Sequence, residues 1–181
     1  VGMTLTRDEL LQLALMASEN RAAAALARAY PGGVPAFVAA MNRKAEALGM
    51  MDTRFVDSTG LNRGNVSTAQ DLVKMVKASY GYELIREYTT AHSHAVAQRK
   101  SRNLPFHNSN QLVQSKSWDI GLSKTGYIHD SGRCLVMQAK IAQQAVIIVL
   151  LDSWGKYTRN ADANRIKRWI ETSFTHKPHS S

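Results

Sequence analysis

Apolar residues recur at helical spacing through the N-terminal half of the chain. Residues 8–17 ("DELLQLALMA") carry leucines on one side of a helical repeat, and residues 21–30 ("RAAAALARAY") are dominated by strong helix formers. Residues 35–48 and 67–79 repeat the pattern, while "SEN" and "PGG" interrupt it. The pattern therefore predicts four helices over these ranges.

Start signals support three of these helices. Thr6 followed by Glu9 matches a capping box, in which each residue satisfies a backbone N–H of the other. Pro35 suits the first position of a helix, where a missing N–H costs nothing. Thr68 with Asp71 predicts a second cap, at the start of the fourth helix.

The C-terminal half changes to short apolar runs that are typical of strands. These runs are "HAVAQRK", "WDIGLSKTGYI", "RCLVMQAKI" and "AVIIVLL", at residues 94–100, 118–128, 133–141 and 145–151. The last three are joined by "HDSG" and "AQQ", which are short enough for antiparallel hairpins. Residues 157–171 predict a closing helix, and residues 173–181 a flexible tail. We therefore expect one α+β domain over residues 1–172, with helices packed on an antiparallel sheet.

Composition is that of a globular protein, with 44% hydrophobic and 20% charged residues and a formal net charge of +9. The longest apolar run is strand-sized, and "VGMTLTRDELLQ" carries no signal-peptide pattern, so neither a spanning helix nor a leader is expected within these residues. The positive charge suits an anionic partner. The basic residues are scattered and not interleaved with aromatics, so a nucleic-acid partner is not expected.

Neither a metal site nor a cofactor is predicted. His92 with His94 and His176 with His179 form loose pairs without a third ligand at a familiar spacing. No glycine-rich phosphate loop is present in the sequence, and "DSTG" at residues 57–60 is interpreted as a turn. The single Cys134 lies in a strand-like run and is interpreted as a small buried apolar residue.

Two polar triplets interrupt the apolar pattern. Ser18-Glu19-Asn20 lies between two predicted helices, where a polar triplet is often only a cap. Lys124-Thr125-Gly126 lies in a predicted strand, where a glycine can mark the close approach of a ligand. Each alone is a weak signal. Ser-x-Asn followed by Lys-Thr-Gly, however, is part of the signature of penicillin-binding proteins and class A β-lactamases.

The chain resembles the serine D-alanyl-D-alanine peptidase family of low-molecular-mass penicillin-binding proteins, and within it the D,D-endopeptidases. The similar segments are "SENRAAAALA", "FVDSTGLNRGNVSTAQDL", "NSNQL", "KTGYIHDSGRCLV" and "DSWGKYTRNADANRIKRWI". The resemblance implies a β-lactamase/transpeptidase-like α+β fold, of which residues 1–172 form the C-terminal portion. The N-terminal part of the same protein is then an expected partner of this chain.

Two departures from the family pattern matter. The nucleophilic Ser-x-x-Lys motif belongs upstream of Ser-x-Asn, and residues 1–17 do not contain it. The sole match, Ser153-Trp154-Gly155-Lys156, follows the last predicted strand, so we reject it as the nucleophile. Family members often carry threonine where this chain has Ile128, and a hydroxyl that could hold the substrate carboxylate is thereby lost.

The resemblance implies catalytic roles for three residues. Ser18 would belong to the proton network and help to protonate the leaving amine. Asn20 would donate its side-chain amide to the bound peptide and orient the catalytic lysine of the Ser-x-x-Lys motif. Lys124 would place a cation beside Ser18 and favour proton transfer.

Three neighbouring residues are implied to bind substrate. Thr125 would hold the terminal carboxylate of the stem peptide, and Gly126 would permit close approach of its backbone. The backbone N–H of Tyr127 would supply an oxyanion donor. The edge of this strand could also pair with an extended peptide.

The implied function is that of a periplasmic serine D,D-peptidase. It would cleave peptidoglycan stem-peptide cross-links through an acyl-enzyme, without a cofactor, and β-lactam antibiotics would acylate it. A β-lactamase is an alternative, although no Glu-x-x-Leu-Asn-like segment lies between the two motifs. A non-catalytic cell-wall-binding module is a second alternative, and a basic nucleic-acid binder a third.

Overall fold

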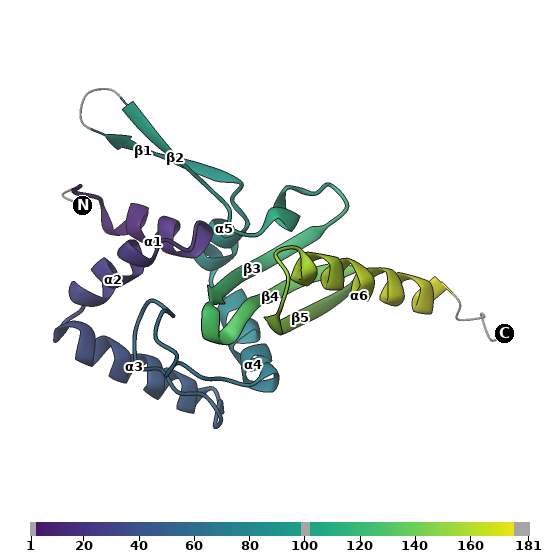
Figure 1. Ribbon diagram of the computed structural model, residues 1–181, viewed down its shortest axis with the longest axis horizontal. Helices are drawn as coiled ribbons and strands as arrows, with labels where there is room; N and C mark the ends of the chain where they lie inside the picture. The colour runs from purple at the N-terminus through teal and green to yellow at the C-terminus, as the bar shows by residue number, and fades with distance from the viewer. Residues whose placement is uncertain (1–2, 99–101, 176–181) are drawn as a thin grey trace.

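The structure is a computed structural model that describes residues 3–98 and 102–175 (Figure 1). Its helices are α1 (Arg7–Met16), α2 (Asn20–Arg28), α3 (Gly33–Ala47), α4 (Ala69–Tyr80), α5 (Glu83–Thr90) and α6 (Thr158–Thr175), with 3-10 turns at Gln111–Gln114 and His129–Ser131. Its strands are β1 (Ser93–Gln98), β2 (Arg102–His107), β3 (Asp119–Ile128), β4 (Gly132–Ile141) and β5 (Gln144–Ser153).

The central sheet is an antiparallel meander in the order β3-β4-β5, so β3 lies at one edge. The turn between β4 and β5 places Ala142 and Gln143 at positive φ, 47° and 64°. Two successive left-handed residues match the right-handed twist of a two-residue hairpin. An antiparallel sheet with flanking helices confirms the predicted α+β fold class.

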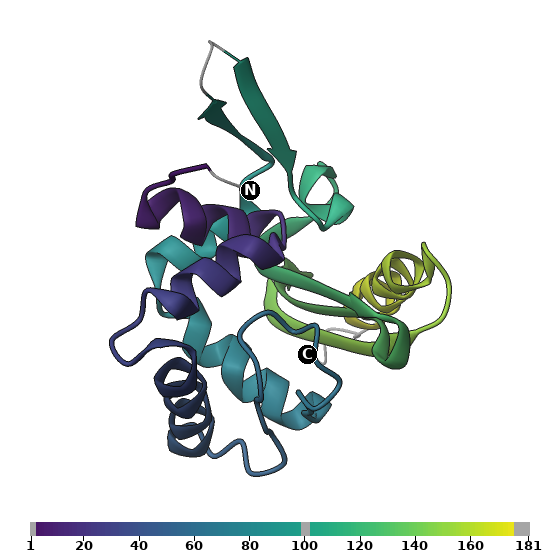
Figure 2. The same ribbon diagram turned by 60° about the vertical axis from the view of Figure 1, so that its left-hand side comes forward.

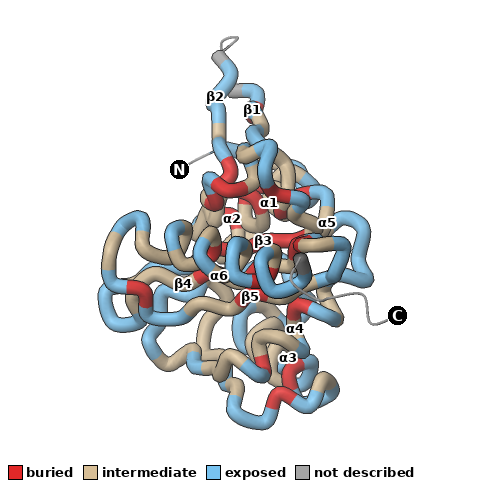
Figure 3. Tube along the Cα trace, turned by 90° about the vertical axis from the view of Figure 1, so that its right-hand side faces the viewer, coloured by how far each residue is buried: buried red, intermediate tan, exposed pale blue. Residues whose placement is uncertain are grey.

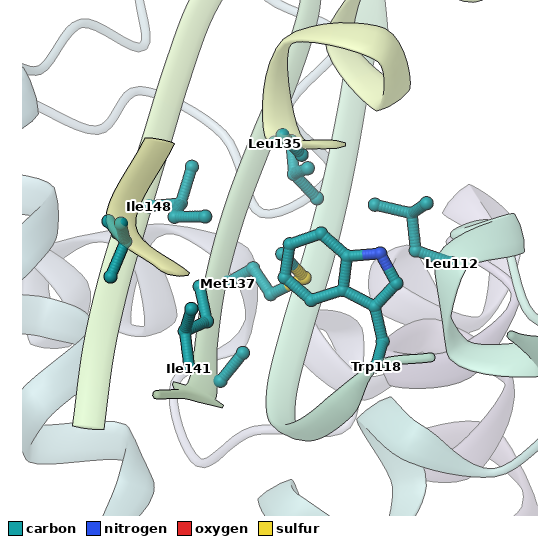
Figure 4. Close-up of a cluster of buried hydrophobic side chains, with 9 residues drawn as sticks. Leu112, Trp118, Leu135, Met137, Ile141 and Ile148 are labelled. Atoms are coloured by element: carbon teal, nitrogen blue, oxygen red, sulfur yellow. The ribbon is translucent and has the colours of Figure 1, made fainter. Parts of the chain in front are cut away.

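Helices cover both faces of this sheet. Figure 2 shows α6 on one side of the sheet and α4 on the other, and α5 packs against β3. The main core lies between β4 and α6, where Leu135, Met137 and Ala163 are fully buried (Figure 4). The ring of Trp118 closes this core, and its Nε1–H donates to Asn164 Oδ1 at 2.9 Å, so its polar atom is satisfied.

A second, smaller cluster joins the N-terminal helices to the hairpin of β1 and β2. Leu13 of α1, Ala22 of α2 and Val96 of β1 are its buried members. The hairpin projects away from the rest of the molecule (Figure 3), and Val96, midway along β1, is the buried position among the described residues of its two strands. This cluster fixes α1 and α2, and therefore the connection between them, relative to the sheet.

Most predicted elements are confirmed. The four N-terminal helices and the three strands of the meander are present within a few residues of the expected bounds. Thr6 and Glu9 form the capping box, and the side chain of Thr68 accepts from the backbone N–H of Asp71. The third helix is present, but it begins at Gly33, two residues before the predicted start at Pro35, after Gly32 adopts φ 83°.

Other boundaries also differ from expectation. Helix α6 continues to Thr175, past the predicted domain end at residue 172, because the sequence after Glu171 contains no helix breaker until Pro178. Residues 176–181 of the expected tail lie outside the described residues. Strand β2 and helix α5 were not predicted. No helix in the described part of the chain is long and apolar enough to span a bilayer.

Candidate active site

Ser18 lies in the connection between α1 and α2, in an uncommon backbone conformation. Its φ is 57°, in the left-handed region that non-glycine residues rarely adopt. Helix α1 ends where the Ala17 N–H donates to the Leu13 carbonyl, and Glu19 caps α2 through the Arg21 N–H. Such strain persists where the surroundings fix a side chain in place.

Lys124 reaches Ser18 across the gap between β3 and the helices. Its Nζ donates to Ser18 Oγ and, at 3.0 Å, to the carbonyl oxygen of Thr125. Burial lowers the pKa of Lys124 to about 8, and the nearby positive charge of Arg159 acts in the same direction. An ammonium group in this position can exchange a proton near neutral pH.

A third hydroxyl group, that of Ser109, connects Ser18 to Thr125. Ser109 Oγ lies 3.1 Å from Ser18 Oγ and accepts from Thr125 Oγ1 at 2.7 Å. The Ser109 N–H donates to the carbonyl of Met16 at 3.0 Å, at the end of α1. The hydroxyl groups of the two predicted motifs therefore belong to one hydrogen-bonded chain.

Ser109 occupies this place because its neighbours anchor the segment. Asn108 Nδ2 donates to the carbonyls of Thr89 and Ala91 at 2.9 and 2.8 Å, and Asn110, only 1% exposed, accepts from the Leu112 N–H. Ser109 belongs to "NSNQL", one of the family-like segments of the sequence, but no role was predicted for it. Two asparagines flanking a serine are a signal for a fixed loop, although they do not reveal what the loop faces.

The six predicted site residues all line one cleft. Its volume is about 480 Å³, and residues 58–61 also line it. The predicted residues in it are Ser18, Asn20, Lys124, Thr125, Gly126 and Tyr127. Asn20 is the first residue of α2, and Lys124 to Tyr127 are near the C-terminal end of β3, which is an open sheet edge. The cleft thus has an edge strand along one wall and a helix start along another.

Two arginines that were not predicted as site residues, Arg133 and Arg159, also line the cleft. Arg159 of α6 donates through Nη1 to the carbonyls of Gly126 and Cys134 at 3.4 and 3.3 Å. Its Nε is buried and has no hydrogen-bond partner among the described residues. Burial and the adjacent Arg133 both lower the pKa of Arg159. The site therefore concentrates positive charge around an unsatisfied donor.

The Ser-x-x-Lys match at residues 153–156 does not line this cleft. Ser153 is the last residue of β5, is buried, and lies opposite Arg133 in the sheet register. Trp154 is 98% exposed, and none of the residues from 153 to 156 lines the cleft. Within the described part of the chain, His, Cys, Asp and Glu also form no group of three that could hold a metal.

The antiparallel meander, the helices that cover it and the Ser–Lys contact at the β3 edge match the fold of solved penicillin-binding D,D-peptidases. The chain belongs to the D-alanyl-D-alanine carboxypeptidase family, Peptidase_S11, whose model matches residues 1–155. It is 51% identical over 173 residues to a D-alanyl-D-alanine endopeptidase of Pseudomonas aeruginosa, covering 95% of this chain and 56% of that protein. A D-alanyl-D-alanine endopeptidase of Escherichia coli K12 is 51% identical over 169 residues, covering 93% and 54%.

Solved structures agree with this family. A D-alanyl-D-alanine carboxypeptidase from Mycobacterium tuberculosis superimposes with a TM-score of 0.85 at 27% identity, over 99% of this chain and 68% of that one. The Streptomyces K15 DD-transpeptidase gives 0.82 at 28% identity, over 91% and 67%. The chain spans about half the length of the curated relatives it matches.

Proposed function

We propose that this chain forms part of a serine D,D-peptidase that cleaves peptidoglycan stem-peptide cross-links and is acylated by β-lactams. The observation that carries the proposal is the hydrogen bond from Lys124 Nζ to Ser18 Oγ at the wall of the cleft. It joins the two motifs in the arrangement that acyl transfer needs, in a chain 51% identical to D-alanyl-D-alanine endopeptidases. We also propose a periplasmic location, where such a substrate is found.

The nucleophile would come from protein outside these 181 residues. Its serine Oγ attacks the amide carbonyl, the C–N bond breaks and an ester C–O bond forms. The proton of that hydroxyl must reach the leaving amine. Ser18 Oγ, hydrogen-bonded to the ammonium of Lys124, is the group in this chain that can relay it. Water then cleaves the ester, which releases the donor peptide as a free carboxylate.

Substrate would bind along the open edge of β3. An extended peptide adds to an exposed edge through main-chain hydrogen bonds. Gly126 has no side chain to obstruct it, and the Tyr127 N–H would donate to the developing oxyanion. Asn20, at the start of α2, would donate its amide to the peptide from the other wall.

The free carboxylate of the leaving residue would bind between Thr125 and Arg159. Both line the cleft, and the buried Arg159 Nε lacks an acceptor among the described residues. A guanidinium recognises carboxylate through two parallel hydrogen bonds. This cation can replace the hydroxyl that is lost where the chain carries Ile128.

Labelling of the intact gene product with a fluorescent penicillin tests the proposed function. A stable covalent adduct, on a serine in a segment other than these 181 residues, is expected. Peptide mapping locates that serine and shows whether its segment is N-terminal in the same protein. The absence of any adduct would favour a non-catalytic module, and rapid loss of the adduct with penicillin hydrolysis would favour a β-lactamase.

Replacing Ser109 with alanine should slow penicillin acylation about fivefold, because the neutral hydroxyl that links Ser18 to Thr125 is lost. Ser109 Oγ contacts both Ser18 and Thr125, so both lose a partner. Stopped-flow measurement of the acylation rate checks the prediction. Ser115→Ala, at a half-buried serine in a loop outside the cleft, is the matched control. Equal rates for Ser109→Ala and wild type would remove Ser109 from the relay.

A further inference from the structure

We propose that Arg133 is a specificity-determining residue that binds a second carboxylate on the leaving strand. The protein would therefore favour cross-linked peptides over a single terminal D-alanine. The proposal rests on the proposed function and adds the selection of substrate to it. Arg133 is at the start of β4 and lines the cleft together with Tyr127 and Arg159.

The side chain of Arg133 is held at the rim of the cleft by an aromatic ring. Its guanidinium carbon lies 4.3 Å from the ring centroid of Tyr127, a residue that is 56% exposed. The two residues are register partners on β3 and β4, so the sheet itself aligns them. Such stacking uses the face of the guanidinium and leaves the N–H groups along its edge for a ligand.

Arg133 has no carboxylate within ion-pair distance in the described part of the chain, and the one acidic residue that lines the cleft, Glu19, is paired with Arg21. Arg133 is close enough to lower the pKa of Arg159, and Lys124 adds a third cation to the same cleft. The ion pairs between described residues include neither arginine. Like charges that share a partly desolvated site repel one another. Binding of an anion removes this repulsion.

The number of cations exceeds what a single carboxylate needs. A leaving D-alanine carries one carboxylate, and Arg159 with Thr125 is sufficient to bind it. In a cross-link the leaving residue is a diamino acid attached to a complete stem peptide, which carries further carboxylates. A second guanidinium beside the first matches that longer polyanionic strand.

The test compares two substrates for the intact gene product. One is a cross-linked dimer of stem peptides and the other is a single pentapeptide that ends in D-Ala-D-Ala. For Arg133→Gln, kcat/KM on the dimer should fall about tenfold, mainly through KM, because one charge-assisted contact is lost. On the pentapeptide the fall should be under threefold. Arg133→Lys, which keeps the charge and loses the planar fork, should restore part of the preference.

Arg168→Gln is the matched control, because Arg168 is exposed on α6 and does not line the cleft. It should keep the wild-type ratio between the two substrates. Equal losses on dimer and pentapeptide for Arg133→Gln, or no loss on either, would overturn the inference while the proposed function stands. A wild-type protein that penicillin does not acylate and that cleaves neither substrate would overturn both.

Discussion

Replacing Lys124 with methionine should slow acylation by penicillin about a thousandfold. Methionine has nearly the length of lysine but carries no proton to exchange, and a positioned acid or base typically contributes a factor of about 10² to 10⁴. The loss should be much larger than that for Ser109, because Lys124 Nζ is the donor that faces Ser18 Oγ directly. Stopped-flow measurement of kcat/KM for acylation gives the comparison.

The pH dependence of the acylation rate distinguishes the effect of the positive charge of Lys124 from that of its exchangeable proton. Because its pKa is about 8, the ammonium form is lost as the pH rises through 8, and acylation should decline along an alkaline limb with that midpoint. Lys124→Arg keeps the charge but cannot give up a proton in this range, so the limb should disappear at a low overall rate.

Lys77→Met provides the control for this prediction. Lys77 is on an exposed turn of α4 outside the cleft, so the rate and the pH profile should both match those of the wild type. If Lys124→Met were acylated at the wild-type rate, the proton relay through Ser18 would be wrong.

The sequence predicted the Ser18–Lys124 contact more directly than any propensity argument could. Helix and strand patterns alone leave Ser-Glu-Asn as a cap and Lys-Thr-Gly as a polar interruption. The structure contains the cap as well, because Glu19 caps α2 while Ser18 faces the lysine. The predicted cap is therefore confirmed at Glu19, and the adjacent Ser18 makes the expected contact with Lys124, while the catalytic roles of the triplet stay predictions. The order of the two triplets along the chain, Ser-x-Asn followed by Lys-Thr-Gly, identified the motif.

Strand β2 and helix α5 were not predicted for reasons that lie in their local sequences. Strand β2 contains Pro105, which removes a backbone donor and weakens a strand signal. In the two-stranded sheet of β1 and β2 each strand has a free edge, so the proline is tolerated opposite Ala95. Helix α5 is only eight residues long and ends in two threonines, which favour helices weakly. Its packing against α1 and β3 stabilises it instead.

The missed residues of the site have a different cause, which is distance along the chain. Arg159 meets Gly126 only because α6 returns across the sheet after two further strands. Ser109 meets Thr125 through a loop fixed by asparagine side chains. Hydrophobic periodicity does not predict which residues that are distant in the sequence come into contact. A sequence pattern can name the residues of a motif, but it does not name the partners that folding brings to them.

Replacing Arg159 with glutamine should lower kcat/KM on D-Ala-D-Ala peptides about a hundredfold, because a buried charge-assisted contact to the substrate carboxylate is lost. Glutamine keeps some polarity near the Gly126 and Cys134 carbonyls, which limits the effect on the fold. Steady-state kinetics on a pentapeptide, with circular dichroism to verify folding, measures the loss. Arg168→Gln, on the outer side of the same helix, should show none.

The same variant carries a second readout that a purely structural role would not change. The positive charge of Arg159 contributes to the lowered pKa of Lys124, so its removal should move the alkaline limb of the acylation profile to higher pH. Arg159→Lys keeps the charge but not the two-pronged geometry. It should leave the limb near pH 8 and recover only part of the peptide activity. An Arg159→Gln protein with unchanged peptide kinetics and an unmoved limb would exclude Arg159 from the carboxylate site and would leave Thr125 as the residue that binds the carboxylate.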